Sequence, residues 1–166
     1  MRLAPWTLLA GLVLAGCAGD APAATRKAPD WSFVDLDGAV HSRDAPPGNA
    51  TVLFFMATWC GTCKEEAPMM AELHDDYAPR GVRFYSLDFD ASEPPEAVRA
   101  WQARYAQDWP HGLDRGMAVQ RAFDVTGQSS VAVLDAQGGV VKVWSHGYAR
   151  EAAVRAALDA VLADAA

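Results

Sequence analysis

The sequence predicts an α/β domain whose central mixed β-sheet carries helices on both faces and ends in a β-hairpin followed by a helix. Two continuous β-branched and aromatic runs, residues 51–56 and 82–87, have the length and composition of buried strands. Helical stretches follow both runs, and two further strands and an amphipathic helix close the chain. Because strands alternate with helices before the terminal hairpin, one mixed sheet accounts for the whole pattern. A chain of 166 residues suits a single domain with a full core.

The first half of the domain opens with a hairpin predicted over residues 31–41, whose Asp37-Gly38 pair is a turn sequence. The Pro-Pro-Gly-Asn turn at residues 46–49 leads into the strand at 51–56. A helix is predicted from just after Cys60 to about Tyr77, and the strand at 82–87 follows it.

The second half begins with a helix predicted from residues 93–95, in which Val98, Trp101 and Tyr105 share one face. The sequence Trp-Pro-His-Gly at 109–112 ends that helix, and a short helix at 117–123 follows. Strands at 131–134 and 140–144 flank a Gln-Gly-Gly turn. An amphipathic helix over 150–162 then completes a domain expected to span residues 30–166.

The N-terminus has the features of an export signal. Residues 3–14 are almost entirely apolar, yet too few to cross a bilayer as a helix, which takes roughly 20 residues. The following sequence LAGC, at residues 14–17, resembles the lipobox of bacterial lipoproteins. That resemblance implies cleavage of a signal peptide at residues 1–16 and lipidation of Cys17 on the extracytoplasmic side of a bacterial membrane. Residues 17–29 are then expected to form the lipidated cysteine and a flexible tether. A buried N-terminal helix is the alternative.

The net charge of −7 argues against nucleic acid as a partner, because no basic excess exists to displace counterions from phosphates. We expect no bound cofactor, no resident metal and a monomeric protein.

Cys60 and Cys63 carry the chemistry. They form a CxxC motif where a buried strand turns into a helix, so that Cys60 lies at a helix N-terminus that favours thiolate. This placement makes Cys60 the expected nucleophile and Cys63 the resolving thiol. A structural zinc site would need further ligands, and the four histidines are isolated along the chain. An inert disulfide is the other alternative, although so short a loop stabilises little.

The segment FFMATWCGTCKEEAP at residues 54–68 resembles the active-site segment of the TlpA and ResA-type thioredoxin-like reductases. FDVTG at 123–127 and VLDAQG at 133–138 continue the order of elements in that family. The resemblance implies a thioredoxin-like fold and an oxidoreductase that exchanges disulfides with protein thiols and is recharged by an upstream dithiol donor. It also implies a place in cytochrome c maturation or in envelope redox homeostasis.

Glu66 occupies the position whose acid tunes the cysteine pair in that family. A physical reason exists as well, because Cys63 and Glu66 are neighbours at i, i+3 and a carboxylate there could accept the Cys63 proton. A solvated glutamate like Glu65 is the alternative. Trp59, Gln128 and Ser129 are the expected substrate-docking residues.

The sequence departs from the family at two positions. Ser129 stands where the family has a cis-proline facing the cysteines, and its peptide bond is expected to be trans. Phe54 stands where thioredoxins have a buried aspartate, which shifts the expected proton transfer toward Glu66. Loss of the proline keeps a metal-binding or metallochaperone module using Cys60, Cys63 and Ser129 or a histidine as an alternative. A thiol peroxidase is another, although Ala57 stands where such enzymes carry a threonine.

Overall fold

The computed structural model describes residues 26–44, 48–90, 92–145 and 147–164. These residues form strands and helices in the order β1 (Arg26–Lys27), β2 (Ser32–Val34), β3 (Val40–Ser42), β4 (Ala50–Met56), α1 (Gly61–Tyr77), η1 (Ala78–Arg80), β5 (Val82–Asp88), α2 (Pro95–Arg104), β6 (His111–Leu113), α3 (Ala118–Ala122), β7 (Ser130–Asp135), β8 (Gly139–Trp144) and α4 (Glu151–Asp164).

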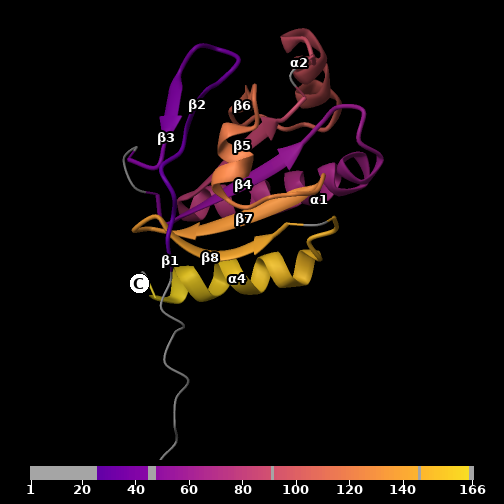
Figure 1. Ribbon diagram of the computed structural model, residues 1–166. Helices are drawn as coiled ribbons and strands as arrows, with labels where there is room; N and C mark the ends of the chain where they lie inside the picture. The colour runs from indigo at the N-terminus through magenta and orange to yellow at the C-terminus, as the bar shows by residue number, and fades with distance from the viewer. Residues whose placement is uncertain (1–25, 45–47, 91, 146, 165–166) are drawn as a thin grey trace, which may run out of the picture.

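Six strands make one mixed sheet in the order β1-β8-β7-β4-β5-β6. Strands β4, β5 and β6 run parallel, whereas β7 is antiparallel to both β4 and β8. The parallel part contains the helical crossovers, and β7 and β8 form the predicted terminal hairpin, with α4 along it (Figure 1). The predicted mixed sheet is therefore confirmed.

The central strand β4 divides the core, since it is buried along its whole length. Its residues Val52, Phe54 and Met56 pack in the same cluster as α1 and α4. Its residues Leu53 and Phe55 pack on the other face, with the β2–β3 hairpin and α3. Successive side chains of β4 point to opposite faces of the sheet, and both faces pack against helices, as the sequence predicted.

Helix α1 follows directly from β4 and presents one apolar stripe to the sheet. Its buried residues recur at helical spacing, and they are Cys63, Glu66, Ala67, Met70, Leu73 and Tyr77. Pro68 lies inside the helix, on its exposed side, and donates no backbone hydrogen bond. Glu66 is the one carboxylate within the buried stripe.

The β2–β3 hairpin packs against β6 at one edge of the sheet. Its turn contains Gly38 at a φ of +86°, a conformation that glycine adopts without strain. Asp35 forms a bridge with Gly112 of β6, where a side chain would collide with the Phe33 ring. Glycine at 112 therefore allows the hairpin to close over the edge strand.

Two strands were not predicted. Strand β1 pairs with β8, and the adjacent Ala28 is buried, with its N–H donated to Gly138 O at 2.9 Å. The expected flexible tether is therefore wrong for residues 26–29, which belong to the domain. The second unpredicted strand is β6, which begins in the 109–112 segment that was expected only to end a helix. Within the described ranges no helix is long and apolar enough to span a membrane.

Candidate active site

The candidate active site lies where the buried strand β4 ends and α1 begins. The intervening turn is closed by a hydrogen bond from Cys60 N to Ala57 O at 3.1 Å. It leaves Cys60 in extended conformation as the N-cap of α1, with Cys63 in the first turn of the helix. The strand and the helix therefore fix the two cysteines at the two ends of one helical turn, on the same side of α1.

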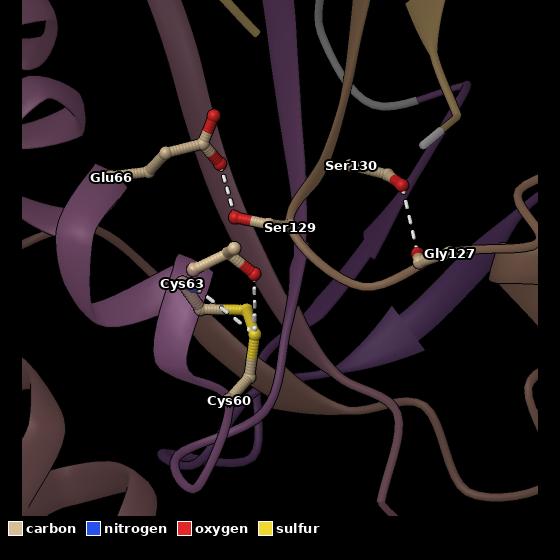
Figure 2. Close-up of a disulfide and its surroundings, with 7 residues drawn as sticks. Cys60, Cys63, Glu66, Gly127, Ser129 and Ser130 are labelled. Carbon is tan, nitrogen blue, oxygen red and sulfur yellow. Dashed lines mark hydrogen bonds between the residues drawn. A yellow bond between two sulfur atoms is a disulfide. The ribbon is translucent and has the colours of Figure 1, made fainter. Parts of the chain in front are cut away.

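Cys60 and Cys63 form a disulfide with their Cα atoms 5.3 Å apart (Figure 2). The Cys60 sulfur accepts a hydrogen bond from Cys63 N at 3.1 Å and lies 3.3 Å from the Thr62 hydroxyl oxygen. A sulfur capping a helix in this way receives an otherwise unpaired N–H and faces the positive end of the helix dipole. Both effects favour thiolate at Cys60 once the disulfide is reduced.

Glu66 lies one turn beyond Cys63 and is buried, with 1% of its surface exposed. The Ser129 hydroxyl donates a short hydrogen bond to Glu66 Oε2 (Figure 2). Burial raises the pKa of Glu66, while the Ser129 hydroxyl and the Ala149 backbone N–H act in the opposite direction. The alternative of a solvated surface residue is therefore wrong for Glu66, although it describes the exposed Glu65.

Ser129 reaches Glu66 from the loop before β7. No peptide bond among the described residues is cis, so the bond before Ser129 is trans, as expected. Ser129 itself has a φ of +56°, which is uncommon for a residue other than glycine. Its neighbour Ser130 donates to Gly127 O at 2.8 Å and so ties the same loop together. Gln128 is exposed, and its backbone carbonyl accepts from Gly147 N at 3.3 Å.

Trp59 is half exposed beside the cysteines. Its indole N–H donates to Asp90 Oδ2 at 2.6 Å, and its ring meets Phe89 edge-on. The neighbouring Thr58 hydroxyl donates to Glu93 Oε1 at 2.5 Å. The loop after β5 therefore holds the turn before the active site through two side chains and leaves a large apolar surface next to Cys60.

Asp88 is a buried carboxylate that sequence reasoning did not identify. It ends β5 opposite Met56 in the parallel register, and its Oδ1 accepts from Asp90 N at 2.8 Å. Burial raises its pKa to about 6, and the negative charges of Glu93 and Asp90 add to that effect. A polar residue closing an apolar strand next to the active-site strand was the signal available in the sequence. Two buried carboxyl groups thus lie at this end of the domain, Glu66 on α1 and Asp88 on β5. Strand β4 has the apolar Phe54 at the position where thioredoxins carry a buried aspartate.

The described residues contain no group of three or more His, Cys, Asp and Glu side chains arranged to hold a metal ion. His41 Nε2 is hydrogen-bonded to Asp35 Oδ2 at 2.7 Å. The buried His111 is hydrogen-bonded through Nδ1 to Trp109 O at 2.9 Å. His74 lies 3.4 Å from Asp108, and His146 is outside the described residues. Since the Ser129 hydroxyl is engaged by Glu66, the described part of the chain supplies no third ligand to support the metal-binding alternative.

The mixed sheet, the CxxC disulfide at the start of α1 and the loop beside it define a thioredoxin-like protein. The Redoxin family matches residues 23–162, and the chain belongs to that family. The chain is 30% identical over 117 residues to the thiol-disulfide oxidoreductase ResA of Bacillus cereus, covering 70% of this chain and 66% of the relative. It is 31% identical over 116 residues to the ResA of Geobacillus thermodenitrificans, with the same two coverages of 70% and 66%. These matches span just under two thirds of the relatives' length.

A solved structure supports the same fold. The crystal structure of a thiol:disulfide interchange protein of the thioredoxin family from Chlorobium tepidum superimposes with a TM-score of 0.71 at 28% sequence identity. The alignment covers 86% of this chain and 99% of that protein. The predicted thioredoxin-like fold and the resemblance to ResA-type proteins are thereby confirmed.

Proposed function

We propose that the protein is a thiol–disulfide oxidoreductase that exchanges disulfides with protein thiols through Cys60 and Cys63. The observation that carries the proposal is the disulfide at the N-terminus of α1, in which the Cys60 sulfur caps the helix. That geometry stabilises the thiolate needed for attack, and it closes or opens the disulfide within one helical turn. The names of the ResA relatives support the same activity.

In the direction of substrate reduction, the Cys60 thiolate attacks one sulfur of the substrate disulfide. The substrate S–S bond breaks, one substrate sulfur leaves as a thiolate, and a mixed disulfide forms with Cys60. Cys63 then loses its proton and attacks the Cys60 sulfur, which closes the Cys60–Cys63 bond and releases the second substrate thiolate. Two electrons pass from the cysteine pair to the substrate, so an upstream dithiol donor has to return them.

The test is disulfide exchange by the reduced protein with insulin as substrate. Cys60→Ser should abolish the reaction, because no nucleophile remains at the helix cap. Cys63→Ser should retain the first step and accumulate a mixed disulfide through Cys60, detectable by non-reducing electrophoresis and mass spectrometry. A Cys63→Ser protein that forms no adduct, beside a Cys60→Ser protein that does, would reverse the two roles.

We further propose that the domain acts outside the cytoplasm, anchored by lipid on Cys17, in cytochrome c maturation or envelope redox homeostasis. The apolar segment at residues 3–14 and the LAGC sequence at residues 14–17, which resembles a lipobox, support this placement. Cys17 lies outside the described residues. Mass spectrometry of the native protein should find acyl mass on an N-terminal Cys17, and an unmodified N-terminus at another residue would contradict the anchor. Reduction of a disulfide-bonded CxxCH peptide, compared with insulin, tests the proposed substrate class.

A further inference from the structure

We propose that Ser129 is a positioning residue, whose hydroxyl holds the buried Glu66 carboxylate as the acceptor of the Cys63 proton. The proposal rests on the proposed disulfide exchange and deepens it. It assigns a role to the serine that replaces the expected proline, and it explains why a carboxylate can be kept in the buried stripe of α1.

The contact joins two distant segments of the chain. Ser129 and Glu66 are 63 residues apart in sequence, and both side chains are buried. Figure 2 shows Ser129 directed toward the Glu66 carboxylate across from the first turns of α1. Among the described residues Glu66 forms no ion pair and its buried Oε1 has no hydrogen-bond partner, so the Ser129 hydroxyl on Oε2 is the side-chain donor that offsets its charge. A proline at 129 would have neither a hydroxyl nor an N–H to offer.

The backbone at Ser129 supports a specific role for this residue. Its φ of +56° is disfavoured for a residue with a Cβ atom, and a proline, fixed near −65°, could not adopt it. A cost of this kind is retained where the surrounding structure holds the residue in place. The Ser129 hydroxyl bond to Glu66 fixes this loop against α1, whereas the Ser130 hydroxyl bond to Gly127 O stays within the loop.

The chemical consequence concerns the resolving step. Cys63 must lose a proton before its sulfur attacks Cys60, and Glu66 is its neighbour one helical turn away. The proton moves from the Cys63 sulfur to the Glu66 carboxylate, which becomes neutral, while the Cys63 electron pair forms the new bond to the Cys60 sulfur. The S–S bond between Cys60 and the substrate breaks in the same step, and the substrate sulfur leaves as a thiolate. Burial disfavours the ionised carboxylate and raises the pKa of Glu66, and the Ser129 hydroxyl acts against burial, so it lowers the pH at which Glu66 can accept this proton.

Two variants remove the hydroxyl with opposite effects on the backbone. Ser129→Ala keeps the disfavoured φ, whereas Ser129→Gly relieves it, so an effect common to both belongs to the hydroxyl. Ser130→Ala is the matched control, since it removes the neighbouring hydroxyl from the same loop without touching Glu66. The first readout is the Glu66 carboxyl carbon chemical shift against pH, measured in the oxidised full-length protein and assigned with Glu66→Gln. The second is the pH dependence of the resolving step, measured as release of a preformed mixed disulfide.

Both Ser129 variants should raise the pKa of Glu66 by about 1 to 2 units, as expected for loss of a hydrogen bond to a charged group. The midpoint of the resolving step should move upward with it, and Ser130→Ala should change neither quantity. If the Glu66 titration does not move in either variant, or moves while the midpoint of resolution stays fixed, the proposal is overturned. A wild-type protein without disulfide exchange would refute the proposed function instead, and the titration of the oxidised protein would still report on the hydrogen bond.

Discussion

Replacing Asp88 by asparagine should change the pH dependence of stability in a predictable direction. The folded domain raises the pKa of Asp88 from 3.8 to about 6 by burial, so ionisation is disfavoured in the folded state relative to the unfolded one. The stability contributed by protonated Asp88 is complete below its unfolded pKa and is lost as the pH rises through about 6. A shift of about two units, at 1.36 kcal/mol per unit, corresponds to about 3 kcal/mol.

Asparagine has the shape of aspartate but does not ionise, so the variant escapes this loss. The free energy of unfolding of Asp88→Asn minus that of wild type should therefore rise by about 2.4 kcal/mol between pH 4 and pH 7.5, because the unfolded Asp88 is already partly ionised at pH 4. Any constant cost of the amide, whose NH₂ cannot accept a hydrogen bond, cancels in that comparison. Urea unfolding of the oxidised proteins at several pH values measures the difference.

The exposed Glu72 on α1 provides the control, because Glu72→Gln removes a carboxylate that forms no ion pair among the described residues. Its difference from wild type should remain nearly constant over the same pH range. If the Asp88→Asn difference is equally flat, the side chain ionises in the fold as easily as in the unfolded chain, and the reasoning from burial fails.

Three further perturbations have definite expected outcomes. Glu66→Gln should lower the apparent pKa of an active-site thiol, followed by thiolate absorbance near 240 nm, because a neighbouring negative charge is removed; unchanged titrations would exclude this coupling. His111→Gln should flatten the acid side of the stability curve in urea, since burial lowers the pKa of His111 to about 4 and the fold loses about 3 kcal/mol as the pH falls from about 6.5 to that value. Gly112→Ala should destabilise the domain by about 1 to 3 kcal/mol in urea unfolding, because its methyl group would collide with the Phe33 ring, and an unchanged midpoint would show that the hairpin gives way freely.

Much of the fold could be predicted because its central elements carry strong local patterns. Strand β4 is a continuous apolar run, and α1 repeats its buried residues at helical spacing, so both bounds lie within one or two residues of expectation. Strands β1 and β6 have two and three residues, and they exist only through pairing with β8 and β5. No periodicity can develop over so few residues, and tertiary contact decides their conformation.

The candidate site divides in the same way. The CxxC motif and its place at the start of a helix could be predicted, because both depend only on residues that are close together in the sequence. The sequence did not decide whether Glu66 is buried or solvated. Its i, i+3 spacing from Cys63 identifies its neighbours along the helix but not the segment that covers it. The hydrogen bond with Ser129 crosses 63 residues, and the buried Asp88 depends on the register between β4 and β5. Contacts of this range appear only when the chain is folded.

The two margins of the sheet differ in how much edge they leave for strand addition. One margin ends in the exposed, basic Arg26–Lys27 pair of β1, which is too short and too charged to template another chain. At the other margin the β2–β3 hairpin lies over β6, and Leu36 N donates to His111 O at 2.8 Å. An extended segment of a partner chain can pair with an exposed edge strand through backbone hydrogen bonds. The pairing with β1 reaches only Gly139 and Val140 of β8. Among the described residues the outer edge of β8 from Val141 to Trp144 therefore has no neighbouring strand, and this is where we expect an extended partner segment to pair.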